Sequence, residues 1–408
     1  MSTAHSPSAS SGTAHHASPT GVPPTNADID RETPQPAIHV EERRLGLHDF
    51  LKTAVKIGGS DIHLQASSVP MIRVDGRARF LDCPPPSDEA MKEYVDAILK
   101  SQGEPDEKRH TLEHKGAVDV AYNLVGVARF RTNIFHSREK YAIVMRRIVT
   151  KIPNFEELNL PPQIEEMANY HRGIVVVSGT TGSGKSTSLA AVIGKINRTR
   201  AERIITVEDP IEFQHENAKS LVSQVEVGTD SESYEYALRA MMRQDPDTIL
   251  IGEIRDSFSL TTALRAADTG HLVFTTVHAT NAPMTIERLV SLFDPMQKEL
   301  QQTQLGLNLN AVVCQRLAKR RDGKGRIPVN EIMIATPIVR KYIIEGEFEK
   351  LKGTVGNREA GSQSFDQHLT ELFQKQIIDV AEARRLASNA DALNLALRGI
   401  SNSDTRLR

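Results

Sequence analysis

The stretch GTTGSGKST, residues 179–187, combines residue types and spacing that could do chemistry. Gly179, Gly184, Lys185 and Ser186 fit the pattern G-x-x-x-x-G-K-[ST], between the apolar run GIVVVS and the helical pattern STSLAAVIGKI. Glycines let backbone N–H groups converge on phosphate oxygens, and the helix that follows adds the positive end of its dipole. The segment therefore predicts a phosphate-binding loop between a buried strand and a helix.

In such a loop the lysine reaches the β- and γ-phosphates of ATP and the first hydroxyl binds Mg²⁺. The alternative is a chance turn rich in glycine and serine, which the flanking strand and helix patterns disfavour. We therefore predict ATP and Mg²⁺ as ligands, with Ser186 on the metal. The residues expected to contact the nucleotide are Thr181, Gly182, Ser183, Gly184, Lys185, Ser186 and Thr187.

Acidic residues follow two further apolar runs, where a parallel sheet binds its ligands at the carboxyl ends of the strands. In DPDTILIGE the acid is Glu253, one position beyond the usual place, and it is predicted to serve Mg²⁺ or the attacking water. In RIITVEDPIEF the acids are Glu208 and Asp209. For this pair two interpretations stay open, a part in catalysis or the solvation of a turn that follows a strand.

Two histidines stand at the ends of the apolar run in GHLVFTTVHATNA. His278, at the carboxyl end, could sense a γ-phosphate, although a histidine after a strand is more often structural. A metal site with His271 is not predicted, because the strand separates the two rings. The chain has two cysteines, Cys83 and Cys314, too far apart in sequence for a disulfide framework and too few for a four-cysteine zinc site.

The wider pattern predicts an organisation in several parts. Residues 1–42, rich in Ser, Thr, Pro and Ala, read as a disordered leader, and 43–150 as a small α+β domain with a hairpin turn at Asp75-Gly76. A proline-punctuated linker is expected over 151–165. Residues 166–298 alternate apolar strands with helices, which predicts a parallel sheet, and 299–408 read as mainly helical, with IPVNEIMI as a possible strand.

Composition narrows the class of partner. With 408 residues, two or three domains are expected. The net charge of −2, an aromatic content of 5% and the absence of tryptophan give no basic or stacking surface for nucleic acid, so no nucleic-acid partner is predicted. No apolar stretch approaches the length of a membrane span, so a cytoplasmic protein is expected.

Taken together, the motifs resemble those of a known family. GTTGSGKST, ITVEDPIEF, ILIGEIRD and GHLVFTTVHATNA resemble, in this order, the Walker A, Asp-box, Walker B and His-box of the secretion ATPase superfamily. GGSDIHLQ, MIRVDG and ARFRTNIF resemble the PAS-like N-terminal domain of type IV pilus retraction (twitching motility) ATPases. SQSFDQHLTELFQKQIIDVAEARRLASNADAL resembles the end of that family, so the resemblance covers about residues 45–398.

The resemblance implies an α/β fold, with a RecA-like P-loop NTPase domain behind a small N-terminal α+β PAS-like domain. It implies a homohexameric ATPase motor of pilus retraction, in which Glu208 activates water, Glu253 supports Mg²⁺, and Arg129, Arg131 and Arg146 contact the γ-phosphate. It further implies contact with an inner-membrane pilus platform protein, a possible paralogous retraction ATPase as partner, and a cytoplasmic location peripheral to the inner membrane.

Two alternatives within the superfamily stay open. PIVRKYIIEGEFEKL matches a C-terminal motif of the family only loosely, so the chain could be an accessory or catalytically weak nucleotide-binding paralogue that docks on the main motor. A pilus-extension or type II secretion ATPase is disfavoured, since the four-cysteine zinc module usual there cannot be built from two cysteines. A nucleic-acid motor, from a different class, would need the basic or aromatic surface that this composition lacks.

Overall fold

The computed structural model describes residues 38–39, 45–74, 77–148 and 152–397. The predicted leader, 1–42, falls outside these residues except for the two-residue strand β1 (Ile38–His39). The predicted turn at Asp75-Gly76 also falls outside them, although the strands on its two sides pair as the hairpin requires. The N-terminal part (45–148) and the C-terminal part (152–397) are taken separately below.

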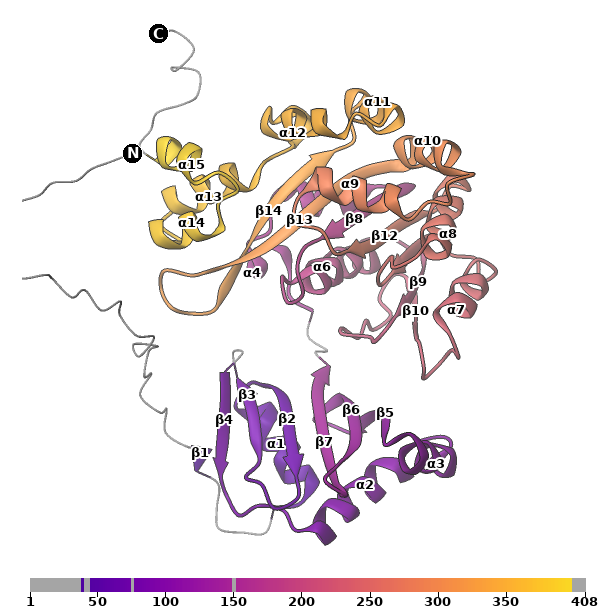
Figure 1. The fold of residues 1–408 in the computed structure, drawn as a ribbon, viewed down its shortest axis with the longest axis vertical. Coiled ribbons are helices and arrows are strands. Elements are labelled where there is room, and N and C mark those ends of the chain that lie inside the picture. Colours follow the sequence, from indigo (N-terminus) through magenta and orange to yellow (C-terminus); the bar gives the residue numbers. More distant parts are fainter. Residues whose placement is uncertain (1–37, 40–44, 75–76, 149–151, 398–408) are drawn as a thin grey trace, which may run out of the picture. The chain divides into compact units, whose positions relative to one another are not determined.

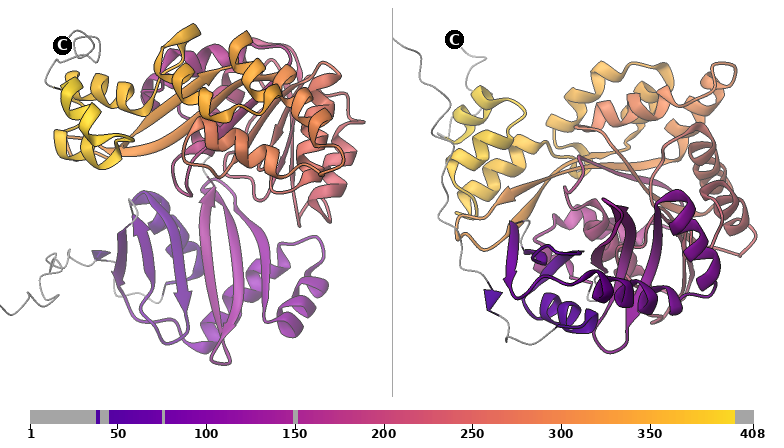
Figure 2. Two further views of the ribbon diagram at one scale, coloured as in Figure 1. Left: turned by 45° about the horizontal axis from the view of Figure 1, so that its top comes forward. Right: turned by 60° about the horizontal axis from the view of Figure 1, so that its bottom comes forward.

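The N-terminal part is a mostly antiparallel sheet with three helices, coloured indigo to magenta (Figures 1 and 2). Its strand order is β1-β4-β3-β2-β7-β6-β5. In β6 the buried Phe130 and Ile134 alternate with the partly exposed Arg129 and Arg131, so one sheet face joins the helices in an apolar core and the other is polar. The predicted α+β organisation is confirmed. The elements are α1 (Leu47–Lys56), β2 (Gly59–Gln65), β3 (Met71–Val74), β4 (Arg77–Asp82), α2 (Asp88–Lys100), α3 (Pro105–Lys115), β5 (Ala117–Leu124), β6 (Ala128–Ser137) and β7 (Lys140–Ile148).

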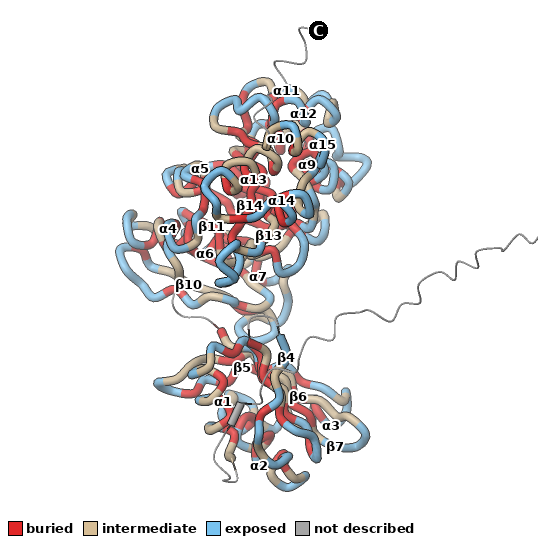
Figure 3. The backbone as a smooth tube through the Cα atoms, turned by 90° about the vertical axis from the view of Figure 1, so that its left-hand side faces the viewer, coloured by how far each residue is buried: buried red, intermediate tan, exposed pale blue. Residues whose placement is uncertain are grey.

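The C-terminal part contains a second seven-stranded sheet, in the order β10-β9-β11-β12-β8-β13-β14. All its neighbouring strands run parallel except β13 and β14, which form an antiparallel pair. All residues of β8, β11 and β12 are buried, as expected for central strands covered on both faces, and the buried stretches are red in Figure 3. The predicted parallel sheet is confirmed. The strands are β8 (Gly173–Ser178), β9 (Arg203–Glu208), β10 (Leu221–Glu226), β11 (Thr248–Ile251), β12 (Leu272–Val277), β13 (Leu309–Lys319) and β14 (Arg326–Ile334).

Alternate residues of these strands enter two different cores. Ile174 and Val176 of β8 pack with the helices from α7 onward, whereas Val175 and Val177 pack with α6 and the segment before β8. The helices on the first face are α7 (Tyr234–Met241), α8 (Ser257–Asp268), α9 (Ala282–Ser291), α10 (Lys298–Asn308), α11 (Pro337–Glu345), α12 (Phe348–Gly356), α13 (Phe365–Gln374), α14 (Val380–Leu386) and α15 (Ala390–Leu397). Those on the second face are α4 (Phe155–Leu158), α5 (Pro162–Glu166), the 3₁₀ turn η1 (Met167–Asn169) and α6 (Lys185–Thr199), and a further turn, η2 (Glu359–Gly361), precedes α13.

Short polar side chains set the starts of several of these helices. Ser233, Asp256 and Asn281 each accept a hydrogen bond from the backbone N–H three residues on, at the starts of α7, α8 and α9. These caps satisfy donors that the first turn leaves unpaired. Of these helices, α8 and α9 begin directly after the acidic motif ILIGEIRD and the histidine motif GHLVFTTVHATNA.

Two predicted boundaries differ from the structure. Residues 309–319, which the sequence predicts as helical, form the strand β13 beside β8. The prediction was wrong because the run LNAVVCQRLAK includes polar residues, Gln315 among them, that the sheet buries. The predicted strand IPVNEIMI is confirmed as part of β14. The predicted linker 151–165 is too long, since Phe155, Leu160 and Ile164 lie in the same core as α6.

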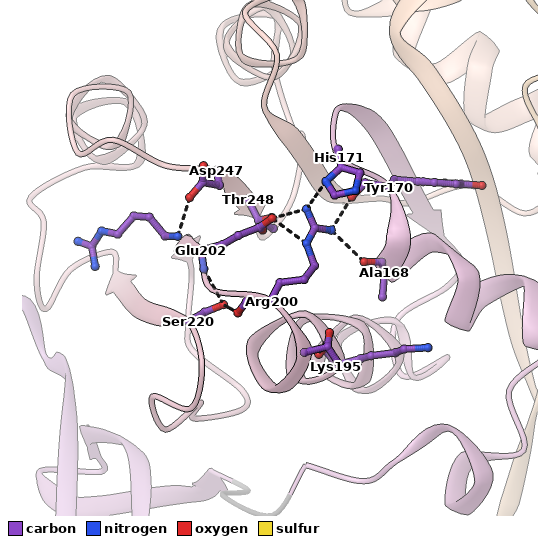
Figure 4. A network of polar contacts seen from close by, with 11 residues as sticks. Ala168, Tyr170, His171, Lys195, Arg200, Glu202, Ser220, Asp247 and Thr248 are labelled. Atoms are coloured by element: carbon purple, nitrogen blue, oxygen red, sulfur yellow. Dashed lines mark hydrogen bonds and ion pairs between the residues drawn. The ribbon is translucent and has the colours of Figure 1, made fainter.

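A network around Arg200 ties the segment before β8 to the amino ends of β9 and β11 (Figure 4). The Arg200 guanidinium donates to the carbonyls of Ala168 (3.0 Å) and Tyr170 (2.6 Å), and its Nε donates to Glu202 Oε1 (2.7 Å). Thr248 of β11 donates to the other oxygen of Glu202 (3.0 Å). The Arg200 side chain is 16% exposed, so the pair is shielded from water and holds three chain segments together.

We expect Arg200→Ala to destabilise the C-terminal part, because it removes the positive charge beside Glu202 and the donor to Glu202 Oε1 and to two backbone carbonyls. The loss should be roughly 3–5 kcal/mol in the free energy of unfolding, as for other broken shielded ion pairs. Urea unfolding followed by circular dichroism measures it. Arg172→Ala, at an exposed arginine directly before β8, is the matched control and should change stability by no more than about 0.5 kcal/mol. Equal effects of the two variants would contradict this account of the network.

Candidate active site

The predicted phosphate-binding loop lies where expected, between β8 and α6. Gly179 has φ 150°, and a Cβ there would lie 2.5 Å from the Gln315 carbonyl oxygen and 2.6 Å from Ser183 Oγ. Gly182 and Gly184 also have positive φ, at 75° and 85°. The first glycine is therefore required by close packing against β13, as well as by its backbone conformation.

A buried glutamine on β13 is hydrogen-bonded to the backbone of the loop. Gln315, 1% exposed, donates through Nε2 to the Ser183 carbonyl (2.8 Å). Its Oε1 accepts from Ser188 Oγ of α6 (2.8 Å) and Asn330 Nδ2 of β14 (3.0 Å). The amide thus joins the loop, the first turns of α6 and the β13–β14 pair, and leaves neither end of its side chain unpaired.

The side chain of Lys185 forms its hydrogen bonds within its own loop. Its Nζ donates to the carbonyls of Gly179 (2.9 Å) and Thr180 (3.2 Å). Burial lowers the pKa of Lys185, and the nearby carboxylates of Glu253 and Glu212 oppose that change. The ammonium group can therefore exchange two neutral carbonyls for the negative oxygens of a phosphate.

The other predicted loop residues share the same short segment. Thr181 and Gly182 are exposed at its tip, Ser183 is buried, and Gly184, Ser186 and Thr187 are partly buried at the start of α6. The Ser183 hydroxyl is buried without a hydrogen-bond partner. The loop thus holds an unused polar group beside the backbone that would face a phosphate.

Glu208 ends β9 on the sheet face that α6 covers. Its Oε1 accepts two hydrogen bonds, from Thr206 Oγ1 (2.7 Å) and Gln224 Nε2 (3.1 Å). Burial of the carboxyl group raises the pKa of Glu208 to about 7, the charges of Glu212 and Glu226 act in the same direction, and the two donors act against it. A carboxyl with a pKa near 7 is suited to accept a proton at neutral pH.

Glu253 follows β11 and lies in a different environment. Its Oε2 accepts from Arg255 Nε (2.7 Å), and its Oε1 lies 3.4 Å from His278 Nε2. Arg255 also approaches Asp209 Oδ2 (3.3 Å). The Tyr234 hydroxyl accepts from the Glu253 N–H (3.1 Å) and donates to its carbonyl (3.0 Å), so the backbone of Glu253 is held as well.

One pocket joins the start of α6 to the carboxyl ends of β9, β11 and β12. Its lining includes Ser186, Glu208, Gly252 and Thr276, with Phe213 and His215 from the loop after β9. The predicted Ser186 and Glu208 therefore share one cavity, and Glu253 and His278 lie together at the same edge of the sheet. This is the edge at which parallel sheets bind ligands.

The three predicted arginines belong to the N-terminal sheet. Arg131 and Arg146 face each other across β6 and β7, and Arg129 is two residues before Arg131 on β6. Arg146 forms an ion pair with Asp61 (2.8 Å), and Arg131 lies 4.0 Å from Asp119. Their contact with a γ-phosphate stays a prediction.

Among the residues that the structure describes, no group of three or more His, Cys, Asp or Glu side chains could hold a metal ion. Mg²⁺ in phosphoryl-transfer sites needs no such cage, because it is bound by one or two protein oxygens together with substrate phosphates and water. The Ser186 hydroxyl and the Glu253 carboxylate are oxygens of this kind. The site therefore fits the predicted ion.

Several residues of the site were missed by the sequence reasoning. Thr206 could have been found, because it lies two positions before Glu208 on a strand and so points to the same face. Arg255 is visible in the quoted GEIRD. Gln224, Tyr234 and Gln315 carry no local signal, since only the fold brings them to the edge of the sheet.

We expect Gly179→Ala to weaken ATP binding at least about tenfold, or 1.4 kcal/mol, since its Cβ would overlap the Gln315 carbonyl and force the loop to move. Isothermal titration calorimetry with ATP measures the change. Gly323→Ala, in the exposed loop between β13 and β14, is the control: its φ is also positive, yet nothing lies within 4 Å of a Cβ there. It lies outside the phosphate-binding loop, so its ATP affinity should stay close to that of the parent. Equal losses in both variants would argue against the packing explanation.

Comparison with known proteins places the chain in a family. The model of the family described as "Type II/IV secretion system protein" matches residues 42–331. The chain is 40% identical over 330 residues to a twitching motility protein of Neisseria gonorrhoeae, covering 81% of this chain and 87% of that protein. It is 38% identical over 356 residues to the type IV pilus ATPase PilU of Pseudomonas aeruginosa, covering 87% of this chain and 92% of that protein.

Solved structures agree with the sequence comparison. A crystal structure of the pilus retraction motor PilT with bound ADP superposes with a TM-score of 0.78 at 36% identity, covering 85% of this chain and 98% of that one. The likeness confirms the predicted fold class, a small N-terminal α+β domain before a RecA-like P-loop domain. The chain therefore belongs to the type II/IV secretion system protein family, within the group of the pilus retraction ATPases PilT and PilU.

Proposed function

We propose that this protein is an ATPase motor that hydrolyses ATP to drive type IV pilus retraction, and with it twitching motility. The observation that carries the proposal is the pocket shared by Ser186 of the phosphate loop and Glu208, whose pKa of about 7 suits a general base. The names of the relatives, a twitching motility protein and pilus retraction ATPases, supply the mechanical task.

The residues present suggest how the reaction proceeds. The loop amides and Lys185 bind the β- and γ-phosphates, with the lysine leaving the carbonyls that it now contacts. Glu208 orients a water molecule in line with the γ-phosphate and takes its proton as the new P–O bond forms and the bond to ADP breaks. ADP and phosphate then leave, and the proton is released from Glu208.

Ser186 and Glu253 are the residues proposed to hold Mg²⁺, which when bound neutralises charge on the β- and γ-phosphates. Glu253 now accepts from Arg255 and lies beside His278, so an ion must share or displace these contacts. His278 is proposed to sense the γ-phosphate through this carboxylate. The exposed Arg255 can move away at little cost, since surface ion pairs are weak.

The assembly is proposed from the family. A homohexamer would complete each site with Arg129, Arg131 and Arg146, and the ring would act on an inner-membrane platform protein, with a paralogous retraction ATPase as a further partner. In the part of the chain that the structure describes, no helix combines the length and apolar character needed to cross a membrane. The cytoplasmic location, with contact to the inner membrane through the pilus machinery, is likewise proposed from the family.

The central test is ATP hydrolysis by the purified chain at several protein concentrations. Glu208→Gln should lower kcat by about 10²–10⁴-fold, the usual contribution of a general base, with ATP binding retained. Lys185→Ala should weaken ATP binding itself. Activity that rises faster than linearly with protein concentration would support ring assembly.

Glu349→Gln provides the control, because this glutamate on α12 is 85% exposed and pairs only with Lys352 among the contacts described for it. It should hydrolyse ATP at the parental rate. A parent chain that binds ATP without turnover at any concentration would reject the motor and favour the catalytically weak paralogue that docks on another ATPase.

The pH dependence of kcat tests the role of Glu208 directly. Its carboxylate form is the active one, so kcat should fall as the pH drops through the Glu208 pKa of about 7. A glutamate with the ordinary pKa of 4.5 would place this acid limb of the pH profile at a far lower pH. Single-turnover hydrolysis between pH 5.5 and 9 measures the limb. The residual rate of Glu208→Gln should lack it, and a limb that persists in that variant would assign the proton to another group.

A further inference from the structure

Two polar side chains clamp the same oxygen of Glu208. Thr206 and Gln224 are direct neighbours across β9 and β10, and Glu208 lies two residues beyond Thr206 on the same face. Both hydrogen bonds, from Thr206 Oγ1 (2.7 Å) and Gln224 Nε2 (3.1 Å), end on Oε1. No hydrogen bond is described to Oε2, and Glu208 lines the pocket that also contains Ser186.

The orientation of the Gln224 amide is fixed by backbone groups of the loop after β9. Its Oε1 accepts from the His215 N–H (2.8 Å), and its Nε2 also donates to the Phe213 carbonyl (2.9 Å). A flipped amide would set its NH₂ group against an N–H donor and its oxygen against both the carbonyl and the carboxylate. Gln224 can therefore only present an N–H to Glu208.

We propose that Thr206 and Gln224 are positioning residues of the hydrolysis reaction, which hold Oε1 of Glu208 so that Oε2 is presented to the attacking water. This inference rests on the proposed function. Neither residue touches the reacting atoms. Both act by fixing one carboxylate oxygen and by favouring its ionised form.

The charges of Glu212 and Glu226 disfavour the ionised form of Glu208, so the neutral donors Thr206 and Gln224 must favour it. Glu226 lies directly opposite on β10, with its own carboxylate bonded to the Ile211 N–H (3.3 Å) and Thr229 Oγ1 (3.1 Å), and Glu212 adds a second negative charge. His215 is buried, which lowers its pKa to about 4, so at neutral pH it brings no positive charge. Lys185 donates to the carbonyls of Gly179 and Thr180, and the carboxylates whose charges act on it are Glu253 and Glu212. The Tyr234 hydroxyl donates to the Glu253 carbonyl.

Removing either donor should therefore raise the pKa of Glu208 further. In Thr206→Val and Gln224→Met, near-isosteric changes, we expect the acid limb of kcat to move to higher pH by about one unit, and further in the double variant. The KM for ATP should stay within about twofold, and most of the rate should return at pH 9. A merely structural role would lower the rate at every pH and leave the limb in place.

Gln304→Met is the matched control, because it also removes an amide-to-carboxylate hydrogen bond, to Asp268 (2.8 Å), on the opposite face of the sheet. It should leave the limb unchanged. Thermal melting of each variant shows whether it folds. If Thr206→Val and Gln224→Met both fold and the acid limb of kcat stays at the parental pH in both, the proposal is overturned.

A second readout separates this inference from the proposed function. NMR titration of the chain carrying ¹³C-labelled glutamate, with Glu208 assigned from the signal lost in Glu208→Gln, reports its pKa without turnover. If the parent does not hydrolyse ATP, the proposed function fails. The titration still shows whether Thr206 and Gln224 favour the ionised form of Glu208. An unchanged Glu208 pKa in Gln224→Met and Thr206→Val rejects it.

Discussion

The close packing of Gly179 against the backbone of Gln315 is the constraint on which the site depends. No side chain fits at residue 179, and the Gln315 amide holds the same loop through the Ser183 carbonyl. Both contacts exist only because β13 runs parallel to β8 in register, with Cys314 beside Ser178. The phosphate loop is thus shaped by a strand more than 120 residues later in the chain, and its geometry is a tertiary property.

The two acids that are predicted to be catalytic, Glu208 and Glu253, lie in different environments at one edge of the sheet. Glu208 is partly buried and its described hydrogen bonds come from neutral donors, and burial of its carboxyl group raises its pKa to about 7. Glu253 is 24% exposed and ion-paired with Arg255. Different environments for two carboxyls are a general way to divide roles, with a proton acceptor in one place and a fixed negative charge, suited to a cation or to His278, in the other.

Much of this could be read from the sequence, because the relevant signals were local. The loop glycines, Lys185 and the acids at the ends of apolar runs follow from motif spacing and from the rule that parallel strands bind ligands at their carboxyl ends. β13 was missed because Gln315 and Arg316 interrupt its apolar pattern, although Gln315 is buried for a reason that only the loop supplies. The roles assigned to Glu208, Glu253, His278 and the three arginines remain predictions, since no ligand contact tests them.

The two strands that carry Glu208 and Gln224 differ in how firmly the sheet holds them. β9 has neighbours on both sides and is anchored at its amino end, where Glu202 meets Arg200 and Thr248. β10, which carries Gln224, is the edge strand of the sheet and is only partly buried. Local opening costs least where few neighbours must be broken. Glu208 itself thus lies on a firmly held strand, while the donor that orients it comes from the strand that can move most easily, so catalytic orientation can change without disturbing the phosphate loop.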